Sequence, residues 1–278
     1  MRRRPDAGPA HPRPVLIGAL GGSGTRSLVR VLRAAGIEFG QWTDPHTEDA
    51  LAFRVFLARY FDPIIDSLQG GKPVPHAAER AFEEAVRVHR SGHAEPGAPW
   101  GWKNPRNMWL LPFYAGFFPG LRFVHLVRDG RDMALSENRF LLTEHGAAVG
   151  LDEWALDPVS AQLGLWARGN LWAARCAQRY LAADAYHVVR YEDLCHEPAA
   201  ALQDLLEFVG AERPAWRAAQ CAPWIVPSTR LGAWRDDPRF DDTTYDEDVL
   251  RALQLFGYDG THRLTAWAAG VTLVADSR

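Results

Sequence analysis

The stretch IGALGGSGTRSL at residues 17–28 constrains the fold of this chain more than any other part of the sequence. An apolar run, PVLIGAL, ends in glycines, and the following TRSLVRVLRAAG carries its apolar residues at helical spacing. A buried strand that turns through glycines directly into a helix is typical of α/β folds. Such a turn gathers backbone N–H groups at the positive end of the helix dipole, which suits it to hold an anion.

Two more buried-strand patterns follow, LRFVHLVRD at residues 121–129 and AYHVVRYEDL at 185–194. Apolar residues fill nearly every position of the first, as expected for a parallel strand covered on both faces. Alternation of strands with helical patterns predicts a three-layer α/β/α fold with a central, mostly parallel sheet. Segments 98–106 and 222–238 are interpreted as loops. Helices are expected at residues 25–36, 46–61, 77–90, 107–118, 130–145, 158–182, 200–210 and 246–258.

Length and composition favour one domain of ordinary globular type. The 278 residues suffice for a single large α/β domain, expected at 14–278 behind a flexible leader at 1–13. A net charge of −3 argues against nucleic-acid or membrane binding. The three cysteines are odd in number and lack CxxC spacing, which favours a reducing compartment and disfavours a zinc site. Because the sequence shows no signal-peptide pattern and no membrane-length apolar run, the expected location is the cytoplasm.

The glycine turn differs from the Walker A loop of nucleoside-triphosphate sites. That loop requires GxxxxGK[ST], whereas here five residues separate Gly18 from Gly24 and TRS replaces the GK[ST] end. The only cation in the stretch is Arg26. A glycine-rich turn without any ligand is the structural alternative. The accumulation of glycines and hydroxyls favours an anion site instead.

Unusual side chains also follow the other two strand patterns. Arg128 ends the second strand and Ser136 comes eight residues later, so a guanidinium and a hydroxyl can converge on one phosphate. Asp129 and Asp132 could hold the neighbouring arginines by ion pairing, and a charged helix start without a ligand is the alternative. Tyr191 leaves the third strand, where its ring can stack on a purine or pack at a helix start. Ligands of open α/β sheets bind beyond the carboxyl ends of the strands, so these positions are read together.

In this order, the motifs GGSGTRSL, VRDGRDMALS and VRYEDL resemble those of the sulfotransferases that use 3′-phosphoadenosine 5′-phosphosulfate. A late segment, STRLGAWR at 228–235, matches that family's R-x-G motif. The resemblance implies a P-loop-like sulfotransferase fold whose first loop binds the 5′-phosphosulfate. It also implies that Arg128, Ser136 and the late loop hold the 3′-phosphate and that Tyr191 lies by the adenine. The residues expected to bind the cofactor are Gly22, Ser23, Gly24, Thr25, Arg26, Ser27, Arg128, Ser136, Tyr191, Arg230 and Gly232.

The chain is more similar to tyrosylprotein and related bacterial sulfotransferases than to the cytosolic small-molecule enzymes. The cytosolic enzymes carry a lysine in the first loop and a histidine base before a later strand, and neither is evident here. Lys103-Asn104-Pro105 matches the K-[DN]-P segment of the tyrosylprotein group. The first-loop arginine of that group is not matched, because Gly22 stands in its place and Arg26 comes four residues later.

The resemblance also implies catalytic roles. Lys103 would donate to the sulfate and to the oxygen that bridges it to the leaving 5′-phosphate of 3′-phosphoadenosine 5′-phosphate, and no metal is required. The acceptor needs a general base, which in tyrosylprotein sulfotransferases is a glutamate shortly after the first helix. Asp49 or Glu48 is the preferred candidate in this chain. The other candidates are Asp44, His46 and His125, the last on an apolar strand where a histidine is more often a core residue.

The expected acceptor is a hydroxyl or amine of a small molecule, a carbohydrate or a natural product, and a homodimer is left open. Four tryptophans near the proposed catalytic loops are candidates for an aromatic pocket wall, although such residues are more often part of the core. They are Trp42, Trp100, Trp102 and Trp109.

Two other functions are kept as alternatives. A small-molecule P-loop kinase is the alternative enzyme, but it needs the Walker lysine. A non-enzymatic alternative is a degenerate nucleotide-binding protein that kept the phosphate motifs and lost the chemistry.

Overall fold

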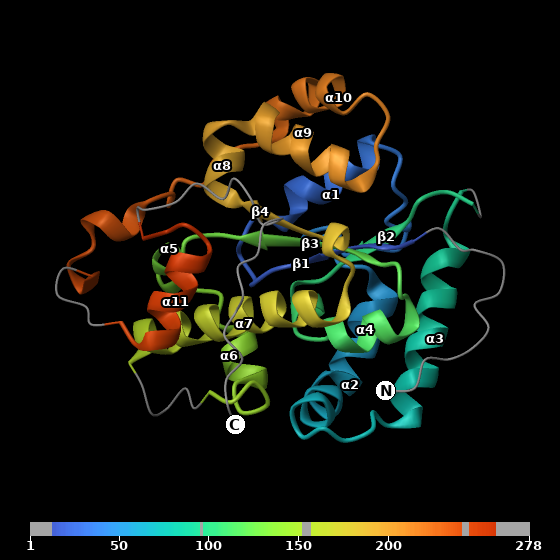
Figure 1. Cartoon of the computed structure of the whole chain (residues 1–278), viewed down its shortest axis with the longest axis horizontal. Coiled ribbons are helices and arrows are strands. Elements are labelled where there is room, and N and C mark those ends of the chain that lie inside the picture. The colour runs from blue at the N-terminus through green and yellow to red at the C-terminus, as the bar shows by residue number, and fades with distance from the viewer. Residues whose placement is uncertain (1–12, 95–96, 152–156, 241–244, 260–278) are drawn as a thin grey trace.

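The computed structural model describes residues 13–94, 97–151, 157–240 and 245–259. A four-stranded sheet crosses the molecule with helices on both faces (Figure 1), which confirms the predicted three-layer α/β/α fold. The strands are β1 (Val15–Gly18), β2 (Gly101–Lys103), β3 (Arg122–Val127) and β4 (Tyr186–Arg190). The helices are α1 (Thr25–Ala34), α2 (Leu51–Gln69), α3 (His76–Ser91), α4 (Leu111–Phe117), α5 (Gly130–Ala134), α6 (Phe140–His145), α7 (Pro158–Tyr180), α8 (Tyr191–His196), α9 (Pro198–Val209), α10 (Pro214–Cys221) and α11 (Glu247–Leu255).

All pairings in the sheet are parallel, and the strand order is β2-β1-β3-β4. β1 therefore lies inside the sheet, between β2 and β3. Ile17 is opposite Lys103 in β2 and opposite Val124 in β3, so the carboxyl ends of these three strands point to the same edge. In an open parallel sheet, ligands bind at this edge. The topology thus brings the loops after β1, β2 and β3 together.

Side chains of the strands alternate between two hydrophobic cores, one on each face of the sheet. Leu16 and Phe123 belong to the larger core, which includes residues of α2, α4 and α7. Ile17 and Val124 belong to the smaller core, which includes residues of α1 and α9. In Figure 1, α1, α8, α9 and α10 lie on one side of the sheet and α2, α4 and α7 on the other. Burial on both faces explains the nearly continuous apolar runs of the inner strands.

The segment 98–106, expected to be a loop, contains the edge strand β2. Three residues are too few to display a period of two in the sequence. The tryptophans of this region are core residues: Trp100, Trp102 and Trp109 are at most 1% exposed, and Trp102 stacks on Phe53 with 4.4 Å between ring centroids. The expectation that they wall an aromatic pocket is therefore wrong. Trp42, by contrast, is 47% exposed.

The helix expected to start at residue 46 begins at Leu51. Asp44 is the physical reason, since its Oδ1 accepts the backbone N–H groups of His46 and Thr47 at 2.9 Å each. These bonds close a turn over residues 44–49 where a helical start was expected. This turn carries candidate catalytic side chains, so its shape matters for the site.

The other helix predictions are confirmed, apart from that over 130–145, which forms two short helices, α5 and α6. The pattern at 107–118 corresponds to a 3₁₀ turn, Pro105–Met108, followed by α4. Among the described residues, no helix is long and apolar enough to cross a membrane. The single domain at 14–278 stays a prediction, and nearly all of the proposed leader at 1–13 lies outside the described residues.

His125 is a core residue of β3 and is fully buried. Its ring lies 2.7 Å from the Tyr186 hydroxyl and 2.9 Å from Asn170 Oδ1. Burial lowers the pKa of His125 from 6.5 to about 4. Since the ring does not line the cavity described below, the reserve role of His125 as a general base is not supported.

His125 should make the protein less stable in acid. Its pKa is lower in the folded chain than in the unfolded chain, so the unfolded chain binds more protons between about pH 4 and pH 6.5, and stability falls as the pH drops through this range. One such group contributes a slope of at most about 1.4 kcal/mol per pH unit. His125→Gln should reduce the slope of unfolding free energy against pH, measured by urea titration. Part of this slope should remain in the variant, because burial also lowers the pKa values of His89 and His187 to about 4.

His196→Gln is the matched control, because His196 is an exposed histidine at the end of α8. That variant should keep the pH dependence of the wild type. Identical slopes for wild type and His125→Gln would contradict the assignment of His125 as a buried, neutral core histidine.

Candidate functional site

The glycine loop between β1 and α1 has a backbone that only glycine adopts readily. Gly22 has φ +96° and Gly24 has φ +90°, both in the left-handed region. A Cβ on Gly24 would lie 2.8 Å from the ring of Tyr191, so the loop and this tyrosine are closely packed. The N-terminus of α1 has no side-chain cap. Its first backbone N–H groups are consequently available to an anion.

Residues on both sides of Ser23 line a cavity next to this loop: Gly22, Gly24, Thr25, Arg26 and Ser27. Ser23 itself is 2% exposed, and its hydroxyl donates to the Leu20 carbonyl at 2.8 Å. The Ser23 hydroxyl thus serves to close the loop, and binding of the cofactor by Ser23 stays a prediction.

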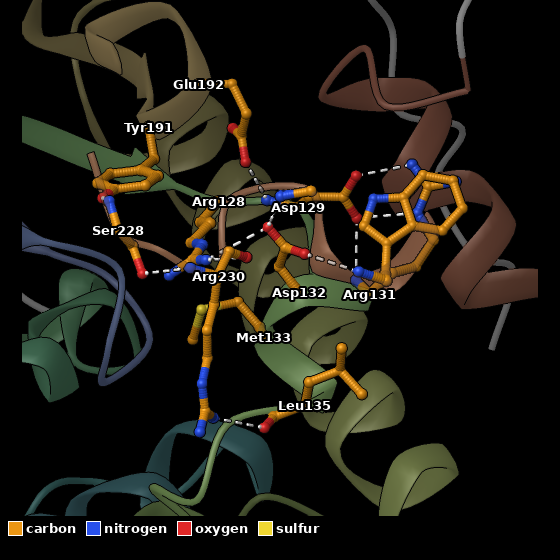
Figure 2. Close-up of polar contacts among 12 residues, drawn as sticks. Arg128, Asp129, Arg131, Asp132, Met133, Leu135, Tyr191, Glu192, Ser228 and Arg230 are labelled. Atoms are coloured by element: carbon orange, nitrogen blue, oxygen red, sulfur yellow. Dashed lines mark hydrogen bonds and ion pairs between the residues drawn. The ribbon is translucent and has the colours of Figure 1, made fainter. Parts of the chain in front are cut away.

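Arg128 follows β3 and is the centre of a polar network (Figure 2). Its Nη2 donates to Asp132 Oδ2 at 3.3 Å and to the Arg230 carbonyl at 3.0 Å, and its guanidinium lies 4.9 Å from the centre of the Tyr191 ring. Arg131 forms a two-point ion pair with Asp129, at 2.9 and 2.7 Å. The ion pairing expected within this segment is confirmed. Arg128 lines the cavity in spite of these contacts.

Asp132 connects the end of β3 to the late loop. It is 4% exposed, and besides Arg128 it accepts the backbone N–H groups of Gly232 at 2.7 Å and Trp234 at 3.2 Å. One buried carboxylate thus fixes two segments about a hundred residues apart in the sequence. Gly232 has φ +76°, which the tight turn requires.

The backbone of Arg230, not its side chain, contacts Arg128. The side chain is exposed and donates to the Leu135 carbonyl at 3.2 Å (Figure 2). Ser136 lies beyond the end of α5, not two turns into a helix as the sequence predicted, and its Oγ is 3.6 Å from the Cβ position of Gly22. Arg230 and Ser136 do not themselves line the cavity but lie against Arg128 and Gly22, which do. Gly232 is bound to Asp132, and neither of these two residues lines the cavity.

Tyr191 begins α8 and is 8% exposed. Its hydroxyl accepts the backbone N–H of Ser228 at 2.8 Å, and burial raises its pKa. The ring is held between the glycine loop and Arg128 and also lines the cavity. Of the two alternatives that the sequence left for Tyr191, packing at a helix start is observed, and stacking on a purine stays a prediction.

Lys103 ends β2 and is 3% exposed. Its ammonium contacts the Thr47 carbonyl and forms an ion pair with Asp49 Oδ1 at 2.8 Å. Arg26 donates to the His46 carbonyl of the same turn at 3.0 Å. Two cations from different strand ends therefore hold the turn at 44–49 against the cavity.

The two preferred candidates for the base lie on opposite sides of this turn. Asp49 lines the cavity and touches Lys103. Glu48, with φ +61°, does not line it and forms an ion pair with Arg33 at 3.1 Å. Asp44 accepts hydrogen bonds from the turn backbone through Oδ1, and its Oδ2 forms an ion pair with Arg54 Nη1 at 2.7 Å. Asp44 and Asp49 both line the cavity, so of the two preferred candidates only Asp49 does.

The cavity has a volume of about 890 Å³, which is within the range of small-molecule sites. Among the described residues, five cationic side chains but two carboxylates line it, so it favours anions. Sequence reasoning missed two of the cations, Arg54 and Arg106. The second directly follows Lys103-Asn104-Pro105, and this adjacency is the signal that could have identified it. The five cations are Arg26, Arg54, Lys103, Arg106 and Arg128.

Substitution of Gly24 tests the packing of the glycine loop. Gly24→Ala places a Cβ at positive φ and against the Tyr191 ring, which cannot retreat easily because its hydroxyl is bound to Ser228. Gly36→Ala is the matched control, since Gly36 has φ +89° but open space around it. We expect the control to cost about 1–2 kcal/mol of unfolding free energy and Gly24→Ala at least about 1 kcal/mol more. Equal losses in urea unfolding would contradict the close packing.

Comparison with known proteins identifies the family and the fold. Residues 14–215 match the model of the sulfotransferase family. No curated protein sequence matches the chain. The sulfotransferase domain of the Synechococcus PCC 7002 olefin synthase is 17% identical, with a TM-score of 0.53, over 90% of this chain and 96% of that domain.

The sulfotransferase domain from the curacin biosynthetic pathway is 15% identical, with a TM-score of 0.52, over 88% of this chain and 98% of the domain. At these identities the similarity shows the fold alone, and it confirms the P-loop-like sulfotransferase fold. The family model spans well over half of the sequence, and the chain therefore belongs to the sulfotransferase family.

Proposed function

We propose that this sulfotransferase takes its sulfuryl group from 3′-phosphoadenosine 5′-phosphosulfate and transfers it to a hydroxyl or amine of a small molecule, a carbohydrate or a natural product. The observation that carries the proposal is that one cavity is lined by the glycine loop, Lys103 and Arg128. These groups follow three adjacent parallel strands. They offer an uncapped helix start for a phosphosulfate, a buried lysine and a buried arginine for a second phosphate.

The residues present fit this nucleotide. Arg128 Nε is buried and, among the described residues, has no hydrogen-bond partner, so a ligand phosphate could satisfy it. The left-handed backbone at Gly22 and Gly24 leaves the loop without side chains where a phosphate would approach. Thr25 and Ser27 add hydroxyls at the start of α1. Tyr191 offers an aromatic surface at the same cavity.

When bound, the nucleotide supplies an activated sulfuryl group with a phosphate as leaving group. Lys103 is suited to stabilise the negative charge that develops there, because its ammonium is held in a fixed position at the cavity wall. An ammonium has three N–H donors. Two are taken by the Thr47 carbonyl and Asp49, which leaves one for an oxygen in the cavity.

Asp49 is the proposed general base. Only Oδ1 of this carboxylate contacts Lys103, so Oδ2 can accept the proton of the acceptor hydroxyl. The ion pair also keeps the base beside the residue that stabilises the leaving group. A single pair, fixed by the turn at 44–49, would thus orient both ends of an in-line transfer.

Nucleotide binding and transfer should separate in two variants. Arg128→Gln should weaken binding of 3′-phosphoadenosine 5′-phosphate about 10- to 100-fold, since hydrogen bonds to charged groups contribute about 1.5–3 kcal/mol. Lys103→Ala should bind this sulfate-free nucleotide nearly as the wild type does but lower the transfer rate by about 10²–10³. Titration calorimetry and transfer of labelled sulfate to an acceptor panel measure the two effects.

Lys72→Ala, which changes an exposed lysine between α2 and α3, is the control for loss of a lysine. It should leave both readouts unchanged. Transfer that survives Lys103→Ala at the wild-type rate would remove this residue from its proposed role.

The two neighbouring carboxylates of the turn provide a matched test of the base. Asp49→Asn should lower kcat by about 10²–10⁴, because it removes the proton acceptor. Glu48→Gln should keep kcat within a few-fold of the wild type, since Glu48 pairs with Arg33 outside the cavity. Steady-state kinetics with any accepted substrate decides between them. A larger loss in Glu48→Gln than in Asp49→Asn would exclude Asp49 as the base.

A further inference from the structure

One cation of the cavity, Arg106, has no part in the proposed transfer of the sulfuryl group. It lies in the 3₁₀ turn after β2 and is 9% exposed, yet it lines the cavity. Its guanidinium lies 5.7 Å from the ring centres of both Phe61 and Phe140. Arg106 is therefore a buried cation that packs near two aromatic rings and also lines the cavity.

The hydrogen bonds of Arg106 fix its orientation without neutralising it. Its Nη1 lies 3.2 Å from His145 Nε2, and His145 Nδ1 lies 2.7 Å from Asp62 Oδ1. A guanidinium can only donate, so Nε2 accepts and the ring proton is on Nδ1, which donates to Asp62. The chain Asp62–His145–Arg106 thus holds the guanidinium in place from the side of α2 and α6.

The charge of Arg106 lacks a direct counter-ion. Among the described residues, no carboxylate forms an ion pair with it, and its hydrogen-bond partner is a ring nitrogen. Burial lowers the pKa of Arg106, while the more distant Asp49 and Asp62 act in the opposite direction. A buried charge with no adjacent counter-ion is unfavourable unless a ligand supplies one.

The other carboxylates of the cavity cannot serve this purpose. Asp49 is paired with Lys103 at 2.8 Å, and Asp44 is paired with Arg54 at 2.7 Å. Among the described residues, Arg106 is consequently the one buried cation of the cavity without a carboxylate partner, since Arg128 pairs with Asp132 and Lys103 with Asp49.

Arg106 comes three residues after Lys103 in the sequence, but its guanidinium packs against side chains of α2 and α6, namely Phe61 and Phe140. Asp49 and Lys103 meet just before α2 begins, whereas Phe61 is about 15 Å further along this helix, at 1.5 Å per residue. The guanidinium packs against Phe61. The cavity wall nearby is apolar, with Phe140, Leu141 and Leu165.

We propose that Arg106 binds a carboxylate of the acceptor, and that the acceptor has an apolar body between this carboxylate and the hydroxyl that receives the sulfuryl group. The proposal rests on the proposed function, because it assigns the acceptor side of the same cavity. A guanidinium held at one edge keeps its remaining N–H donors in a plane, which suits two-point binding of a carboxylate. The aromatic and aliphatic wall suits the apolar body.

The probes are ω-hydroxy fatty acids from 6-hydroxyhexanoate to 12-hydroxydodecanoate, each paired with its methyl ester. Their binding is measured by titration calorimetry on the full chain, with and without 3′-phosphoadenosine 5′-phosphate. We expect at least one acid of the series to bind the wild type about tenfold or more tightly than its ester, and Arg106→Gln to abolish this preference. Arg106→Lys, which keeps the charge but loses the planar fork, should retain part of it.

Arg59→Gln is the matched control, because Arg59 is an exposed arginine of α2 that does not line the cavity. It should keep the preference for the acid. If circular dichroism showed that Arg106→Gln is unfolded, Arg106→Lys would replace it in the test. A reduced preference of Arg106→Lys for the acid over the ester would then support the proposal, and an undiminished preference would contradict it. Equal affinity of acid and ester throughout the wild-type series would overturn the proposal.

A different outcome would assign Arg106 to the nucleotide. If Arg106→Gln weakened binding of 3′-phosphoadenosine 5′-phosphate as much as it weakened acid binding, the acceptor role would be wrong. Failure of the wild type to bind this nucleotide at all would contradict the proposed function instead. The titrations without nucleotide would then still decide whether Arg106 selects a carboxylate.

Discussion

Parallel pairing of β1 with a strand on each side is the constraint on which the site depends. Because β2 and β3 both run parallel to β1, Lys103, the glycine loop and Arg128 emerge at one edge of the sheet. No two of these groups are close in the sequence, and reversing β2 or β3 would move Lys103 or Arg128, respectively, to the opposite edge of the sheet. The buried cores on both faces hold this arrangement by packing α1 and α9 against one face and α2, α4 and α7 against the other.

Most of the cationic side chains that line the cavity are also paired with a carboxylate of the protein. Asp132 holds Arg128, and Asp49 holds Lys103, each through one contact. Such pairs reduce the penalty of burying a cation and fix its direction at the same time. A site arranged in this way is ready for an anionic ligand without large rearrangement, which is the arrangement that electrostatic stabilisation of a transferring group requires.

Much of the fold and part of the site could be predicted from the sequence. The glycine turn and the buried strand before Arg128 carry strong local patterns, because burial on both faces leaves almost no polar residue in the inner strands. The order of the motifs then indicated the family, which the match over residues 14–215 shows. The predictable features were therefore those with a local sequence pattern, namely the inner strands, the glycine turn and the motif residues at the strand ends.

The remaining features depend on contacts that the sequence does not display. β2 is too short to show a period, so its tryptophans suggested a pocket although they fill the core. Glu48 and Asp49 are adjacent and chemically alike, and only the turn closed by Asp44 sends one towards Arg33 and the other towards the cavity. The relation of Arg106 to His145 and Asp62 joins three separate elements, so it could not be found before the packing of α2 and α6 was known.

The central claim is that the cavity recognises a nucleotide with a 3′-phosphate and no triphosphate. A thermal-shift titration of the full chain with 3′-phosphoadenosine 5′-phosphate, compared with ATP and Mg²⁺, tests it most directly. A ligand that binds the folded state alone raises the midpoint of unfolding with its concentration. The account predicts such an increase with 3′-phosphoadenosine 5′-phosphate and none with ATP and Mg²⁺. Stabilisation by ATP and Mg²⁺ alone would contradict it.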